Sequence, residues 1–201
     1  RIEMDGGVIA ERETIRHPGA VAMIPVTAEG NLLLVTQYRH AAGRRLLELP
    51  AGTLERGEEP LAAVSRELQE EVGFRPGRIE PLGGLFVAPG YTTEYIHLFV
   101  CGDLVASALD GDEDEDIEVE VRTPGEALAA IESGEICDAK SIVGILRWER
   151  WRARRGLAAM PTRIATPSSG SSGRLERGSG SSPRTAPITS AADRSGPRPS
   201  A

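Results

Sequence analysis

The chain has 201 residues, of which 40% are hydrophobic, and it carries a formal net charge of -7. That length allows one domain, or one domain followed by a tail. The charge is uneven, since residues 1–149 hold 28 acidic and 13 basic side chains, whereas residues 150–201 hold 2 and 10. An acidic body argues against nucleic acid as the main partner. It favours a protein that binds cations and, through them, an anionic substrate.

The two cysteines, Cys101 and Cys137, lie far apart and lack the spacing of a zinc site. A disulfide framework is therefore not expected, and the reducing cytoplasm is the predicted location. No apolar run approaches the roughly 18 residues of a membrane span, so no membrane contact is expected. No signal peptide is visible. Because the chain begins with Arg1 rather than Met, we expect the N-terminal region to be incomplete.

Five segments have the pattern of strands. Apolar runs at 19–26 and 31–39, separated by a turn that contains glycine, predict two strands of a hairpin or meander. A short strand is predicted at 46–52, and two longer ones at 78–90 and 94–104. A helix is predicted between them at 57–74. Its buried stripe is expected to consist of Leu61, Val64, Leu68 and Val72.

The rest of the chain predicts an acidic loop that runs into a strand (111–123), two helices (124–136 and 139–154) and a tail. The tail, residues 156–201, is rich in Ser, Gly, Pro and Arg and poor in apolar residues, which is typical of disorder. Residues 1–155 are the predicted domain, with 1–15 as its N-terminal strand region. The mixture of strands and helices favours the α+β class or an α/β/α sandwich.

The segment SRELQEEVGF (65–74) places three carboxylates close together. On a helix, Glu67, Glu70 and Glu71 would share one face, where like charges repel each other. A cation bound between them would remove that repulsion, and ligands that offer only oxygen select Mg²⁺ or Mn²⁺. The alternative for such a cluster is a solvated helix face.

The sequence around this cluster resembles the signature of the Nudix hydrolases, G-x5-E-x7-R-E-U-x-E-E-x-G-U, where U is a bulky apolar residue. All seven fixed positions match at the required spacing, and the last U is the aromatic Phe74. The resemblance implies an α/β/α sandwich with a mixed sheet and a loop–helix–loop segment. It also implies metal-assisted attack of water on a diphosphate. The matching residues are Gly52, Glu58, Arg66, Glu67, Glu70, Glu71 and Gly73.

The resemblance also assigns roles to these residues. Glu67, Glu70 and Glu71 are implied as metal ligands together with the backbone carbonyl of Ala51, and Glu70 is also implied as catalytic. Charge-assisted hydrogen bonds of the Glu58 and Arg66 pair would orient the carboxylates. The two glycines have backbone roles: Gly52 would let the loop approach the metal, and Gly73 would end the helix.

The flanking segments are similar to the ADP-ribose pyrophosphatase subfamily over residues 12–147. Pro89, 15 residues after Phe74, is typical of enzymes that prefer ADP-ribose. The resemblance implies Mg²⁺-dependent hydrolysis of ADP-ribose to AMP and ribose 5-phosphate, with Mn²⁺ as a substitute metal. It places the general base on the loop DGDEDEDIEV, with Glu113 as the base and Glu115 as a further metal ligand. The repeated acids leave this register open by a residue or two, and an acidic solvated turn is the alternative.

Four residues are candidate substrate contacts. Arg39 could pair with phosphate, or be a surface arginine at a strand end. Arg16 could stack on adenine, and Glu48 could accept a hydrogen bond from ribose or adenine. Glu94 could orient the terminal ribose or cap a loop. The histidines, His17, His40 and His97, are expected to be structural.

The subfamily resemblance further implies a homodimer in which the N-terminal strands of one subunit help to form the site of the other. Three alternatives remain open for the function. One is a pyrophosphatase for other nucleoside diphosphate sugars such as GDP-mannose. Another is a Nudix-fold module that binds ADP-ribose as a sensor, although such modules tend to lose the carboxylates. The third is a hydrolase of oxidised nucleoside triphosphates.

Overall fold

The computed structural model describes residues 1–3, 5–111 and 116–156, which belong to one compact unit. The predicted tail therefore lies almost wholly outside the described residues, and the domain boundary at 155 stays a prediction. The strands are β1 (Ile2–Glu3), β2 (Ile9–Ala10), β3 (Ala20–Pro25), β4 (Leu32–Arg39), β5 (Arg44–Glu48), β6 (Ala51–Thr53), β7 (Phe74–Phe86), β8 (Tyr95–Ala106) and β9 (Glu118–Arg122). The helices are α1 (Pro60–Glu71), α2 (Pro124–Ser133), α3 (Ala139–Arg154) and the 3₁₀ turn His40–Ala42.

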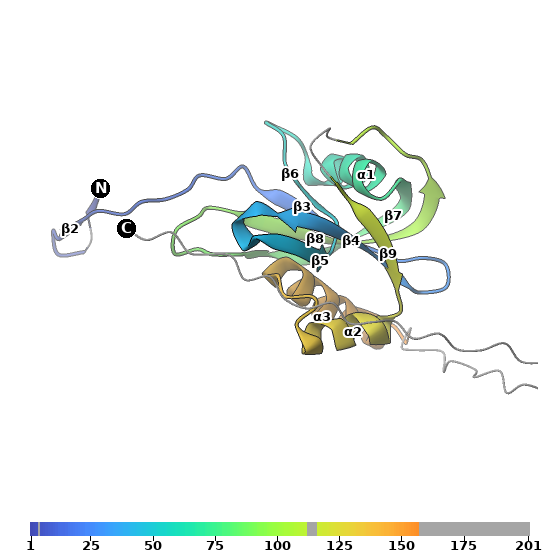
Figure 1. Cartoon of the computed structure of the whole chain (residues 1–201). Helices are drawn as coiled ribbons and strands as arrows, with labels where there is room; N and C mark the ends of the chain where they lie inside the picture. The colour runs from blue at the N-terminus through green and yellow to red at the C-terminus, as the bar shows by residue number, and fades with distance from the viewer. Residues whose placement is uncertain (4, 112–115, 157–201) are drawn as a thin grey trace, which may run out of the picture. The chain divides into compact units, whose positions relative to one another are not determined.

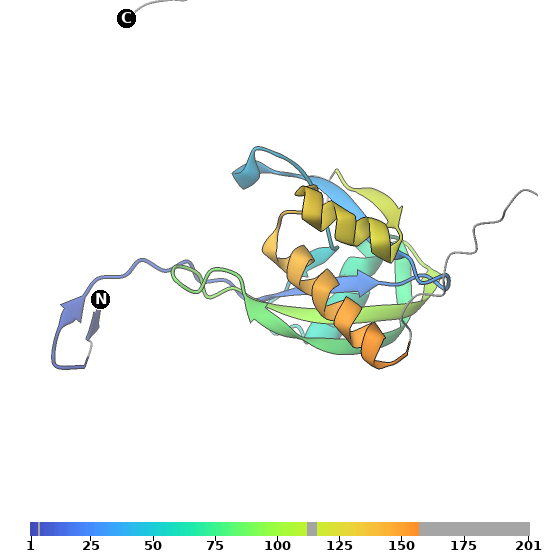
Figure 2. The same ribbon diagram turned by 90° about the horizontal axis from the view of Figure 1, so that it is seen from below.

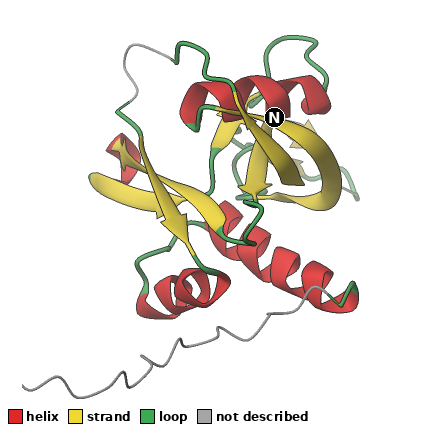
Figure 3. Ribbon diagram, turned by 90° about the vertical axis from the view of Figure 1, so that its right-hand side faces the viewer, coloured by secondary structure: helices red, strands yellow, loops and turns green. Residues whose placement is uncertain are grey.

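The strands form a mixed sheet in the order β6-β3-β8-β7 and an antiparallel sheet in the order β5-β4-β9, besides the β1-β2 pair. In the mixed sheet β3 runs parallel to β8, and the other neighbours are antiparallel. Helix α1 lies on one side of the sheets, and α2 and α3 lie on the other (Figures 1 and 3). The predicted α+β class and α/β/α sandwich with a mixed sheet are confirmed.

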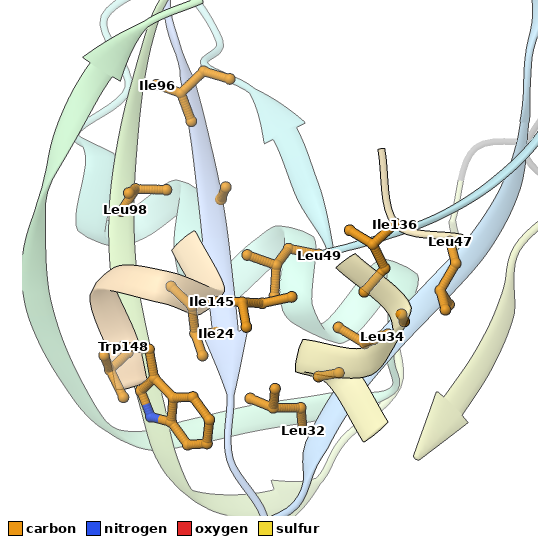
Figure 4. Packing of buried hydrophobic residues seen from close by; sticks show 14 of the residues in the cluster. Ile24, Leu32, Leu34, Leu47, Leu49, Ile96, Leu98, Ile136, Ile145 and Trp148 are labelled. Carbon is orange, nitrogen blue, oxygen red and sulfur yellow. The ribbon is translucent and has the colours of Figure 1, made fainter. Parts of the chain in front are cut away.

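Strand β3 contributes side chains to both hydrophobic cores. Its side chains alternate, so that Val21 and Met23 join the cluster under α1, while Ala22 and Ile24 join the cluster under α2 and α3. Figure 4 shows the second cluster, in which Ile24 packs near Ile145 of α3. Because helices cover both faces, the strand is an unbroken apolar run rather than an alternating one.

The expected hairpin of residues 19–26 and 31–39 is wrong. The two strands lie in different sheets and share only an isolated bridge between Val26 and Leu32. Both edges of β3 are occupied, by β6 and β8, which leaves β4 to pair with β5 and β9. The predicted strand 46–52 is likewise two strands, divided at Leu49 and Pro50. Proline has no N–H to continue a ladder, and here its carbonyl accepts a hydrogen bond from Met23 N–H (2.9 Å).

Helix α1 begins and ends close to the prediction, with Pro60 in its first turn. Gly73 follows the helix with φ of 79°, which suits a residue just past a helix end. The buried stripe differs from the expected one, because Leu61 is 54% exposed. The buried positions instead include two carboxylates, and they are Ala63, Val64, Glu67, Leu68 and Glu71. None of the described helices combines the length and the apolar character needed to cross a membrane.

Candidate active site

The loop between β5 and α1 is fastened to three other elements. Ser141 of α3 accepts a hydrogen bond from Leu49 N–H (2.8 Å) through its buried hydroxyl oxygen. The Pro50 carbonyl is bound by β3, as described above. Ala51 N–H donates to Oε2 of Glu71 on α1 (3.0 Å). The loop therefore approaches the acidic face of α1 along a path that the core determines.

Gly52 lies directly against the Glu67 carboxylate. A Cβ atom built on Gly52 would lie 1.8 Å from the Glu67 carboxyl carbon and 2.0 and 2.2 Å from its oxygens. No side chain fits there, and the carboxylate cannot move far because Glu67 is only 9% exposed. The loop can lie this close to α1 because residue 52 has no side chain. The predicted role of Gly52 in letting the loop approach a metal stays a prediction.

Arg66 joins the remaining charges of the segment. Its Nε and Nη2 donate to the two oxygens of Glu58 (3.0 Å each), and its Nη1 lies 3.0 Å from Glu70 Oε2 and 2.8 Å from Glu67 Oε1. The hydrogen bonds from Arg66 hold the pKa of Glu58 below its usual value, and Glu58 raises the pKa of Arg66. Arg66 therefore favours the ionised form of Glu58 and holds the carboxylates of Glu58, Glu67 and Glu70 around one guanidinium group.

The acidic face of α1 has the chemistry of a hard-cation site. Glu67 and Glu71 are both buried, and both carboxylates lie against the loop of Ala51 and Gly52. Among the described residues, no three acidic, histidine or cysteine side chains already converge as metal ligands. Arg66 and the Ala51 amide occupy oxygens that a cation would use. The donor set is oxygen only, so these residues fit a divalent ion such as Mg²⁺.

The two predicted residues of the acidic loop, Glu113 and Glu115, lie outside the described residues. Their neighbours approach α1, because Leu109 N–H donates to the Gln69 carbonyl (3.2 Å). At the other end of the loop, Asp116 pairs with Arg45 (2.6 Å). The assignment of the base and of the further ligand therefore stays a prediction.

A pocket of about 620 Å³ opens beside the loop. Ala51, Gly52 and three of the four predicted substrate residues, Arg39, Glu48 and Glu94, line it. Arg16 is exposed and is not among the lining residues, although both of its neighbours are. The stacking role of Arg16 stays a prediction.

Glu48 is the charged centre of this pocket. Its side chain is fully buried, and it accepts two hydrogen bonds from Arg39, at Nε (2.8 Å) and Nη2 (3.0 Å). Its second oxygen also accepts a hydrogen bond from Lys140 Nζ. These hydrogen bonds, together with the negative charge of Glu48, raise the pKa of Arg39. Arg39 therefore presents only part of its donor fork to the pocket.

Lys140 and Asp138 were missed by the sequence reasoning. Both line the pocket at the start of α3, where Asp138 caps the helix by accepting from Ser141 N–H (3.1 Å). Lys140 donates to the same Asp138 oxygen (2.9 Å), while the other oxygen, Oδ2, is buried without a hydrogen-bond partner among the described residues. A buried acceptor of this kind awaits a donor from a ligand or water. The available signal was that Lys140 is the only lysine in the sequence.

Two segments that run side by side contribute residues to the lining of the pocket. Ile15 N–H donates to the Tyr91 carbonyl (2.8 Å), and Thr93 N–H donates to the Ile15 carbonyl (3.0 Å). His17 Nε2 lies 4.0 Å from Glu94 Oε1. His17 thus borders the pocket, whereas His97 stacks edge-on against Tyr95 (4.9 Å between ring centroids). The segment of residues 15–17 is therefore part of the pocket wall.

Comparison with known proteins gives consistent relatives. A family model described as a NUDIX domain matches residues 16–142. The chain is 38% identical over 146 residues to the ADP-ribose pyrophosphatase of Bacillus subtilis strain 168 and to the methanol dehydrogenase activator of Bacillus methanolicus. Each of these alignments covers 72% of this chain and 79% of the relative. This chain is also 34% identical over 150 residues to the GDP-mannose pyrophosphatase of Escherichia coli K12, and that alignment covers 69% of this chain and 78% of the relative.

A solved structure described as an ADP compounds hydrolase has a similar fold. It superimposes with a TM-score of 0.69 at 26% sequence identity. The match covers 77% of this chain and 84% of that one. The similarity therefore extends beyond the loop and helix that carry the carboxylates.

Proposed function

The chain belongs to the NUDIX domain family, and from that premise we propose that it hydrolyses the diphosphate of ADP-ribose to AMP and ribose 5-phosphate with Mg²⁺, for which Mn²⁺ can substitute. The observation that carries the proposal is the placing of the α1 carboxylates against the loop of Ala51 and Gly52, at the wall of a pocket of about 620 Å³. A pocket of that size suits a small molecule.

The metal site is assigned to Glu67, Glu70, Glu71 and the carbonyl of Ala51. A bound Mg²⁺ neutralises charge on the diphosphate and lowers the pKa of the attacking water. Arg66 orients the carboxylates through the hydrogen bonds described above. Glu113 takes the proton from the water, and Glu115 adds a carboxylate to the metal site.

The substrate end of the site is assigned to the network around Glu48. Glu48 holds Arg39 and Lys140 beside the pocket, where the two cations favour a diphosphate. Asp138 Oδ2, which has no hydrogen-bond partner in the part of the chain that the structure describes, accepts a hydrogen bond from a hydroxyl or amino group of the substrate. Glu94 lines the pocket beside His17 and binds the terminal ribose, and Arg16 flanks the adenine.

The assembly is assigned as a homodimer. The N-terminal segment carries exposed apolar side chains, with Ile2 at 46%, Val8 at 60% and Ile9 at 56% exposure. Exposed apolar side chains in one segment favour a protein partner. Ile15, which lines the pocket, is 61% exposed, and this supports a site completed by a second copy. Cys101 and Cys137 are both free thiols, in keeping with a reducing cytoplasm.

The substrate is tested by a panel, because relatives of equal identity have different names. We would measure products from ADP-ribose, GDP-mannose, UDP-glucose, NADH and 8-oxo-dGTP, each with Mg²⁺ and with EDTA. AMP and ribose 5-phosphate from ADP-ribose, abolished by EDTA, are the expected result. Faster cleavage of GDP-mannose would replace the proposed substrate. Binding of ADP-ribose without cleavage would instead favour the alternative in which the protein is a sensor that binds ADP-ribose.

The general base is tested separately. Glu113→Gln is expected to reduce turnover while metal affinity, measured by Mn²⁺ titration, changes little. Glu115→Gln is expected to weaken metal binding. The reverse pattern would shift the register of the acidic loop.

A further inference from the structure

A second hollow, of about 460 Å³, lies away from the candidate active site between β7 and the C-terminal half of α3. Its apolar floor consists of Leu82 and Trp151, which also pack against the core. Its rim consists of four arginines, Arg147, Arg150, Arg154 and Arg155. Helix α3, shown in orange in Figure 2, lies across the mixed sheet and brings these residues together.

The rim follows from helix geometry and from an irregularity in β7. Arg147, Arg150, Trp151 and Arg154 recur at three- and four-residue spacing, so they share one helix face. The β7–β8 register shifts between Pro81 and Gly83, which makes Leu82 the extra residue of a bulge. Such bulges redirect a side chain and are frequent beside binding sites.

Two of the arginines are held by the protein. Arg147 Nη1 donates to the Gly84 carbonyl (3.0 Å), and a Cβ on Gly83 would lie 3.2 Å from that nitrogen. Arg155 pairs with Glu80 (2.6 Å), and its guanidinium lies 4.1 Å from the centre of the Trp151 ring. These two cations have fixed positions at opposite ends of the rim.

The other two cations lack a partner of this kind. The side chains of Arg150 and Arg154 form no hydrogen bond or ion pair within residues 1–3, 5–111 and 116–156. The negative end of the helix dipole attracts cations only in the last turn, so it does not account for Arg150. Of the nearby carboxylates, Glu80 is taken by Arg78 and Arg155, and Glu149 by Arg152.

From this arrangement we propose that the hollow binds a small molecule with a diphosphate or two neighbouring phosphates, as a site separate from the candidate active site. Guanidinium groups bind phosphate oxygens in pairs through charge-assisted hydrogen bonds. The volume is within the range of small-molecule pockets. The Leu82 and Trp151 floor receives the uncharged part of the ligand. The proposal does not depend on the hydrolytic activity.

The test uses the full chain and sodium pyrophosphate as the probe, in EDTA, with isothermal titration calorimetry. We expect one pyrophosphate bound per chain, and affinity weaker by about tenfold or more in R150A/R154A, since two charge-assisted contacts are lost. The matched control, R12A/R75A, removes two exposed arginines outside the hollow and should bind as the unmodified protein does.

Absence of binding, or equal affinity in R150A/R154A and the unmodified protein, would overturn the proposal. A second experiment tests whether the phosphate groups belong to a free ligand or to a lipid headgroup. It measures co-sedimentation of the protein with phosphatidylcholine vesicles that contain phosphatidylglycerol. Binding to these vesicles without binding of pyrophosphate would also overturn it, whereas binding of pyrophosphate alone supports it.

Discussion

At the scale of single residues, Glu71 gives the sharpest test of the metal site. Glu71→Gln keeps an acceptor for Ala51 N–H but removes a charge from the site. We expect an unchanged fold by circular dichroism and turnover lower by about 100-fold or more. Glu132→Gln, an exposed change on α2, is the control. Near-normal turnover of Glu71→Gln would contradict the assignment of Glu71 as a ligand.

Gly52 is tested by addition of a single methyl group. In Gly52→Ala the new Cβ would overlap the Glu67 carboxylate, so the loop and α1 must separate. We expect the free energy of unfolding to fall by about 1–3 kcal/mol, with loss of metal-dependent activity. Gly125→Ala is the matched control, because nothing lies within 4 Å of its added Cβ. Equal stability and activity in both variants would contradict the close approach.

The residues of this site differed in how far they could be predicted. Gly52, Glu58, Arg66 and the α1 carboxylates were found because the Nudix signature places them at fixed spacing within one segment. Lys140 meets Glu48 only in the folded chain, 92 positions along the sequence. No local pattern announces such a contact, so its partnership with Glu48 was missed.

At the scale of elements, the Glu58–Arg66 pair connects the loop to α1 and makes a prediction about pH. Hydrogen bonds from Arg66 lower the pKa of Glu58 from 4.5 in the folded state. Glu58 therefore stabilises the fold at neutral pH, and this contribution is lost as the pH falls through the lowered pKa.

We expect Glu58→Gln to reduce the free energy of unfolding by roughly 1–2 kcal/mol at pH 7. The difference from the unmodified protein should narrow as the pH falls below 4.5. Urea unfolding at pH 7 and at pH 3 measures both values. A difference that stays constant between these two pH values would show that the ion pair does not stabilise α1.

The elements themselves were largely predictable, but their pairing was not. Helix α1 was found from apolar spacing and from Pro60, which are local signals. Strand partners depend on which edges other strands already occupy. Here β3 pairs with β6 and β8, so β4 pairs with other strands. The burial of Leu61 was also predicted wrongly. Apolar spacing alone placed Leu61 in the buried stripe of α1, whereas the stripe includes the carboxylates of Glu67 and Glu71.

At the scale of the whole molecule, the exposed N-terminal strands predict an assembly. Removal of residues 1–10 deletes β1 and β2, with the exposed side chains of Ile2, Val8 and Ile9. We expect the shortened chain to be a monomer and to have a higher KM for ADP-ribose, because the proposed second copy would no longer complete the pocket. Light scattering and steady-state kinetics measure these effects. A dimer that survives the deletion would place the interface elsewhere.

The pairing of β3 with β8 bears on how the protein is made. Ala20 pairs with Ile96 and Pro25 with Cys101. Strand β3 therefore cannot complete its pairing until β8, which is synthesised much later, has left the ribosome. The surface that packs under α1 includes Phe99 and Cys101 as well as Val21 and Met23. On the ribosome, the acidic helix therefore emerges before the sheet that supports it is complete. Such distant pairings slow folding, so the carboxylates of α1 are synthesised well before the proposed cation site can form.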